Sequence, residues 1–112
     1  MSASFKMGPE GSVRVWNSTY KVIMRELEWR AATDEIAARI LGLNPAARPI
    51  GLVDLTALDA VEKKGFLDLI GDLRGRASSI STGWCFPEQV DRFPKDLDSI
   101  IERANEAWEF DV

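Results

Sequence analysis

The amino-acid sequence predicts a mainly α fold, a compact bundle of about four helices, with an α+β fold as the alternative. Apolar residues recur at helical spacing through most of the chain, and proline and glycine divide it into segments of helix length. Short alternating stretches predict a small β-hairpin or short strands near residues 3–16, 50–55 and 78–86. The 112 residues, 46% of them hydrophobic, fit one globular domain over residues 1–112.

The N-terminal region combines an irregular start with a brief strand. Glycine and proline interrupt residues 8–11, so residues 1–11 are expected to be loosely ordered, although Phe5 and Met7 are candidates to anchor a short edge strand. Residues 12–16 alternate between apolar and polar side chains, which indicates a strand.

The next segment predicts two helices rather than one. The first begins near Asn17 or Ser18, both favourable N-cap residues. A second helix start is marked by the sequence Thr-Asp-Glu at residues 33–35, where a capping residue precedes acids in the first turn. One unbroken helix over residues 18–42 is the alternative, and it would have to bury two faces. The apolar stripes of the two helices are Tyr20, Ile23, Met24, Leu27 and Ala31, then Ile36, Ile40 and Leu41.

The middle of the chain predicts a short extended segment and then a long helix. Residues 50–55 are apolar and follow a proline-containing connector, so they form either a buried strand or an extended lead-in. The helix that follows runs to about Arg76. Its start is marked by Asp59 and Glu62, whose spacing is typical of a capping box, with Thr56 as the alternative cap.

The last third of the chain predicts one more helix after an ambiguous stretch. Residues 78–86 are rich in small side chains and are either a loop or a strand, because apolar residues alternate toward their end. Pro87 and Pro94 each suit the first position of a helix. We expect the last helix to run from about Pro94 to Trp108. Its inward stripe is Leu97, Ile100, Ile101, Ala104 and Trp108.

Two residue counts exclude familiar catalytic chemistry. The chain has no histidine, so it contains no Ser-His-Asp triad, Cys-His pair or imidazole metal site. Its one cysteine, Cys85, forms no internal disulfide or dithiol redox pair, and the nearby acids favour an inert, partly buried thiol. We therefore expect no cofactor and no metal ion. The single cysteine and the absence of an apolar leader predict a cytoplasmic location.

Acidic residues are concentrated near the end of the chain. Residues 84–112 carry three Lys/Arg and eight Asp/Glu, a net charge of −5, whereas residues 1–83 have a net charge of +1. On a helix that turns about 100° per residue, four of these acids share one outer arc of about 80°. Such like-sign clustering is typical either of a solvated surface or of a docking face for a basic partner. The candidate partner-binding acids are Asp98, Glu102, Glu106 and Glu109.

A second candidate surface is the aromatic segment around Cys85. Phe86 and Phe93 each precede a proline, and Trp84 is next to the cysteine. One interpretation is core packing, because a large aromatic side chain before a proline can fill the seam between two helices. The alternative is that Trp84, Phe86 and Phe93 line a groove for a partner, since aromatic anchors dominate interface energetics.

These observations predict a non-enzymatic, acidic protein-binding domain. Its size and charge are typical of bacterial inhibitor, immunity or antitoxin proteins, which cover a basic surface of a partner such as a toxin. A net charge of −4 argues against nucleic acid, and no apolar run is long enough for a membrane span. One alternative is a regulatory or adaptor domain that forms a homodimer through aromatic residues such as Trp29. The other is a metal-dependent enzyme, whose candidate carboxylates are Asp54, Asp59, Asp68 and Asp72.

Overall fold

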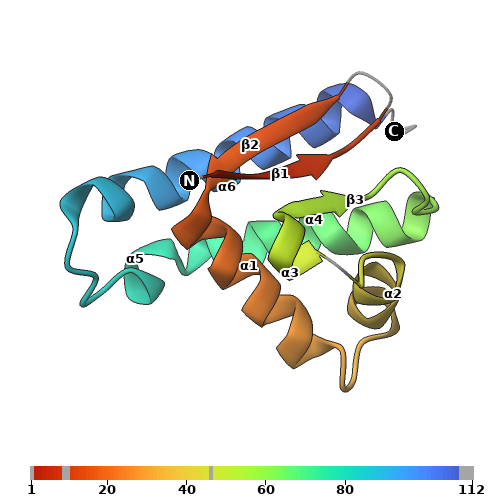
Figure 1. Cartoon of the computed structure of the whole chain (residues 1–112), viewed down its shortest axis with the longest axis horizontal. Helices are drawn as coiled ribbons and strands as arrows, with labels where there is room; N and C mark the ends of the chain where they lie inside the picture. Colours follow the sequence, from red (N-terminus) through yellow and green to blue (C-terminus); the bar gives the residue numbers. More distant parts are fainter. Residues whose placement is uncertain (1, 9–10, 46, 109–112) are drawn as a thin grey trace.

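A computed structural model describes residues 2–8, 11–45 and 47–108 of the chain. The protein is mainly helical with a small three-stranded sheet, which confirms the predicted fold class (Figure 1). The elements in chain order are β1 (Ser2–Lys6), β2 (Ser12–Trp16), α1 (Asn17–Arg30), α2 (Glu35–Leu43), α3 (Ala47–Ile50), β3 (Leu52–Asp54), α4 (Ala60–Gly75), α5 (Ala77–Ile80) and α6 (Pro87–Ala107).

The sheet has the order β2-β1-β3, so the first strand of the chain is its centre. β1 pairs antiparallel with β2, with Phe5 opposite Val13, and parallel with β3, with Phe5 opposite Val53. The expected strands near residues 3–16 and 50–55 are therefore confirmed. The expectation that residues 1–11 are loosely ordered is wrong for Ser2–Lys6, because Phe5 and its alternate neighbours point into the core at the period of a strand.

The expected strand near residues 78–86 is not formed. The chain makes the short helix α5 there and continues in turns. The Ser81 hydroxyl donates to the carbonyl of Ala77 at 2.9 Å, and the Thr82 hydroxyl donates to that of Ser78 at 2.8 Å. These bonds satisfy carbonyls four residues earlier, so the small polar residues extend helical turns instead of pairing as a strand.

The separation of α1 from α2 is confirmed, and so is the predicted start of α4. The Asp34 carboxylate accepts from the backbone N–H of Ile36 at 2.9 Å and caps α2. At the start of α4, the backbone N–H of Glu62 donates to the Asp59 carboxylate at 2.8 Å, and the backbone N–H of Asp59 donates to the Glu62 carboxylate at 2.9 Å, which forms a capping box. Glu62 also forms an ion pair with Arg39, so the same carboxylate ties α4 to α2.

The last helix begins at Pro87 and not at about Pro94 as predicted. Pro87 is its first residue, whereas Pro94 lies inside the helix rather than at its start. A proline has the φ of a helical residue and costs the helix one backbone hydrogen bond. Phe93 and Leu97, one turn apart on either side of Pro94, are both fully buried, and their packing offsets that cost.

The core lies between the sheet and the helices α1, α4 and α6, with α6 running alongside β2 (Figure 1). Phe5 is at its centre, with ring centroids 5.7 Å from Tyr20 and 5.9 Å from Phe66. At the far end of α6, the indole N–H of Trp108 donates to the carbonyl of Met7 at 2.8 Å. Because α6 contacts both the hairpin and α4, it closes the core on one side. The largest fully buried side chains include Phe5, Met7, Ile23, Leu27, Phe66, Phe93, Leu97 and Ile100.

Two glycines of α4 provide a test of the packing of α2 on α4. A Cβ at Gly65 would lie 2.5 Å from Cδ1 and 3.1 Å from Cγ2 of Ile36, whereas a Cβ at Gly71 meets nothing within 4 Å. We expect Gly65→Ala to lower the free energy of unfolding by up to about 2 kcal/mol, because overpacking costs about 1 to 3 kcal/mol and the helix propensity of alanine returns up to about 1 kcal/mol. Gly71→Ala is the matched control and should raise it by up to about 1 kcal/mol, since alanine loses less entropy in a helix. Urea denaturation measures both, and equal stabilisation by the two variants would place α2 elsewhere.

Candidate functional site

The acidic residues of α6 lie on its outer surface, as far as the structure describes them. Asp98 is half-exposed and forms an ion pair with Arg74 of α4 at 2.8 Å. Glu106 is exposed and forms a longer contact of 3.5 Å with Arg103. Glu102 is exposed, and within the described part of the chain it makes no ion pair. The fourth candidate acid, Glu109, lies outside the described residues.

These contacts divide the acidic face into two parts. The Asp98 carboxylate is paired with Arg74 and so connects α6 to α4. Glu102 and Glu106 occupy successive turns farther along the helix, where Arg103 is the one basic residue that follows Asp98 within α6. No basic residue stands in the last turn of α6, where the helix dipole favours one. The acidic face is therefore least compensated between Glu102 and the end of the helix.

The aromatic candidates separate into a core residue and two surface residues. Phe93 is fully buried, so it packs in the core, and the expectation that it lines a groove for a partner is wrong. Trp84 is partly exposed and packs on Phe93, with ring centroids 5.3 Å apart. Phe86 is 59% exposed, so the core-packing interpretation is wrong for this side chain. The buried ring of Phe93 therefore supports the ring of Trp84, while the side chain of Phe86 is mostly exposed to solvent.

An open groove of about 560 Å³ lies between this aromatic segment and helix α1. The α1 wall is one helical stripe, since its members follow at spacings of three and four residues. The facing wall is the turn that leads into α6, where Gly83 adopts a positive φ of 89° that only glycine takes without strain. The lining residues are Ser18, Lys21, Val22 and Arg25 on one side and Gly83, Trp84, Cys85, Phe86 and Gln89 on the other.

The groove combines positive charge with apolar surface, and none of the described residues that line it carries a carboxylate. Lys21 and Arg25 are exposed on successive turns of α1, and neither forms an ion pair with any residue that the structure describes. The Ser18 hydroxyl oxygen is buried and has no hydrogen-bond partner among the described residues. Because this oxygen has almost no accessible surface, the character of the groove comes from Lys21, Arg25 and the apolar side chains. The groove therefore suits an anionic ligand with an apolar side.

Cys85 is exposed in the wall of this groove, and not partly buried as the sequence suggested. Its two aromatic neighbours, Trp84 and Phe86, line the same groove. No histidine exists in the chain to activate it. The thiol thus adds soft, polarisable surface to the groove.

The four carboxylates proposed for a metal-dependent enzyme do not come together. Asp59 is used in the capping box of α4, and Asp68 is exposed on the same helix. Asp54 accepts from the hydroxyl and the backbone N–H of Thr56 at 2.6 and 2.9 Å, and these hydrogen bonds lower its pKa. Within the described ranges, no group of three or more His, Cys, Asp or Glu side chains is arranged to hold a metal ion.

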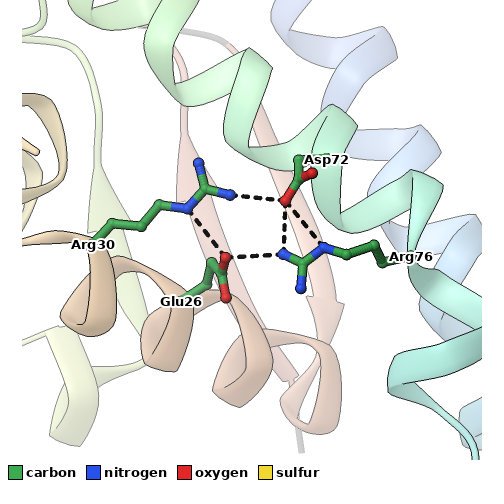
Figure 2. Close-up of polar contacts among 4 residues, drawn as sticks. All are labelled: Glu26, Arg30, Asp72 and Arg76. Carbon is green, nitrogen blue, oxygen red and sulfur yellow. Dashed lines mark hydrogen bonds and ion pairs between the residues drawn. The ribbon is translucent and has the colours of Figure 1, made fainter.

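The fourth carboxylate, Asp72, belongs to a closed ring of ion pairs between α1 and α4 (Figure 2). Arg30 contacts Glu26 at 3.1 Å and Asp72 at 2.8 Å, and Arg76 contacts the same two carboxylates at 2.9 and 2.7 Å. The hydrogen bond to Asp72 is the main cause of a raised pKa of the Arg76 guanidinium. Each charge faces two opposite charges, so the ring joins α1 to α4, and one oxygen of Asp72, Oδ2, accepts from both guanidinium groups.

One polar residue that sequence reasoning missed is Asp96 of α6. Only 2% of its surface is exposed. Its carboxylate accepts from the backbone N–H of Trp16 at 3.0 Å and from the hydroxyl of Thr19 at 2.9 Å. Arg92 approaches the same side chain at 3.5 Å and also lies over the ring of Trp16. Asp96 therefore joins α6 to the junction of β2 and α1, next to the start of the groove.

Comparisons of the chain with protein-family models, with curated proteins and with solved structures found no match. In the described part of the chain, no helix is both long and apolar enough to cross a lipid bilayer.

Proposed function

We propose that this protein is a non-enzymatic binding domain whose acidic α6 face docks on a basic surface of a partner protein. The observation that carries the proposal is the exposure of Glu102 and Glu106 on successive turns of the longest helix. Like charges at this spacing repel by a few tenths of a kcal/mol. A face selected for stability alone would alternate the sign of charge, so the clustering supports a role in recognition.

The dominant effect of such a face is on the rate of association. Opposite charges on a partner steer the encounter, and they can raise the association rate constant by one or more orders of magnitude at low salt. An inhibitor of immunity or antitoxin type benefits directly, since it must reach its target before the target acts. A cytoplasmic location belongs to the same proposal, because a single cysteine suits a reducing compartment.

The experiment is a charge reversal on α6. Glu102→Lys with Glu106→Lys should slow association with the partner by at least about tenfold at low salt. The difference from the wild-type protein should shrink toward about 0.5 M salt, where the Debye length is only a few Å. Both side chains are exposed, so the melting temperature should change little.

A matched control carries the same change of net charge elsewhere. Glu35→Lys with Asp68→Lys alters two exposed acids, one on α2 and one on α4. If net charge alone mattered, both double variants would slow association equally. Equal rates for the wild type and the α6 variant would reject this face as the docking surface.

A further inference from the structure

We propose that residues 109–112 of one copy of the chain, Glu-Phe-Asp-Val, bind in the groove between α1 and residues 83–89 of a second copy. This inference concerns a different surface from the acidic face of α6, and it stands or falls independently of the proposed function. Residues 109–112 lie outside the described part of the chain, so their sequence alone enters the argument.

The groove presents charge and apolar surface on separate sides. Lys21 and Arg25 supply two cations on successive turns of α1, about 6 Å apart along the helix axis. Val22, Trp84 and the 59%-exposed Phe86 supply the apolar surface. One turn beyond Arg25, the same face of α1 continues to Trp29, which is 75% exposed. Exposed tryptophan, arginine and phenylalanine are the residue types that most often anchor interfaces.

Residues 109–112 match this arrangement in spacing as well as in charge. In an extended segment, side chains alternate between two sides. Glu109 and Asp111 then share one side, about 7 Å apart, close to the separation of the two cations on α1. Phe110 and Val112 share the other side and can pack against the apolar wall.

The segment must come from a second copy, because it cannot reach the groove of its own chain. Gln89 lines the groove near the start of α6, and Trp108 follows the end of that helix. The nineteen residue steps from Gln89 to Trp108 correspond to about 28 Å along the helix axis. Four extended residues span at most about 14 Å.

In a dimer of two antiparallel copies, both grooves can be filled at the same time. The groove and Trp108 are at opposite ends of α6, so each copy brings its residues 109–112 to the groove of the other. Reciprocal exchange of this kind closes a two-fold dimer and leaves no open end for further growth. The exposed Trp29 then lies at the edge of the interface.

The experiment measures the mass of the intact protein by sedimentation equilibrium from about 10 µM to about 1 mM. The wild type should pass from monomer to dimer with concentration. The groove variant, Lys21→Glu with Arg25→Glu, and the tail variant, Glu109→Lys with Asp111→Lys, should each raise the dimer dissociation constant at least tenfold. Both groove residues are exposed and unpaired in the described part of the chain, so the groove variant should melt like the wild type.

A mixture of the two variants provides the decisive arm. The reversed groove of the first variant matches the reversed tail of the second, and the unchanged tail of the first matches the unchanged groove of the second. The mixture should therefore form a dimer at concentrations where each variant alone is monomeric. A wild type that stays monomeric at about 1 mM overturns the proposal. A dimer that both variants retain also overturns it, because the contact between copies then lies elsewhere. A mixture of the two variants that stays monomeric overturns it as well, because the groove then does not bind residues 109–112.

Discussion

Replacing Trp108 with alanine should lower the free energy of unfolding by about 3 to 5 kcal/mol, the range measured for large aromatic side chains in cores. Trp108 is 3% exposed and ends the inward stripe of α6. Its ring meets Phe66 edge-on at 6.2 Å, and its indole N–H donates to the carbonyl of Met7. The substitution removes the packing and also leaves that buried carbonyl without its donor.

Two further variants separate these contributions in urea denaturation. Trp108→Phe keeps most of the packing and loses the donor, so it should cost about 1 to 2 kcal/mol. Trp29→Ala removes the same side chain from an exposed position and should change stability by less than about 0.5 kcal/mol. A loss below about 1 kcal/mol for Trp108→Ala would show that α6 does not close the core through this residue.

The second large effect is expected at Asp96. Asp96→Ala should lower the free energy of unfolding by about 3 kcal/mol, because it strands two donors that the carboxylate now satisfies. These are the backbone N–H of Trp16 and the hydroxyl of Thr19, which is itself fully buried. The lost hydrogen bonds lie at the junction of β2 and α1, so the start of α1, which forms one wall of the groove, should also become less ordered.

Asp98 is the natural control, because it lies on the same helix two residues away. Its carboxylate is about half exposed, and its ion pair with Arg74 is a surface contact. Asp98→Ala should therefore cost less than about 1 kcal/mol. Denaturation curves of the two alanine variants measured side by side decide the matter. Similar losses at both positions would mean that Asp96 is not the buried acceptor that joins α6 to α1.

Local rules predicted the elements whose ends are set by neighbouring residues. The capping box of Asp59 and Glu62 is one example, since each cap lies within three residues of the group that it satisfies. The start of α2 is another, although the capping residue is Asp34 and not Thr33, the first residue of the predicted signal. The same rules were wrong where packing overrides them. Pro94 resembles a helix start, but buried residues on both sides carry α6 through it.

The candidate surfaces could be predicted only in part. The helical angles of the acids placed Glu102 and Glu106 on an outer face, where the structure has them. The ion pair of Asp98 with Arg74 depends on the packing of α4 against α6, which no local pattern encodes. Asp96 has the same residue type as its exposed neighbours, and its position at the edge of the apolar stripe was the single available signal. The groove joins residues about 60 positions apart in sequence, so it emerges only with the tertiary fold.

We propose that the protein acts by binding a basic protein through α6. The most direct measurement is quantitative capture from an extract of the cells that produce it, on the wild type, on Glu102→Lys with Glu106→Lys, and on Lys21→Glu with Arg25→Glu. We expect the wild type and the groove variant to retain one basic protein in comparable amounts, and the α6 variant to lose it at low salt. Equal capture on all three proteins, or no basic protein on any of them, would contradict it.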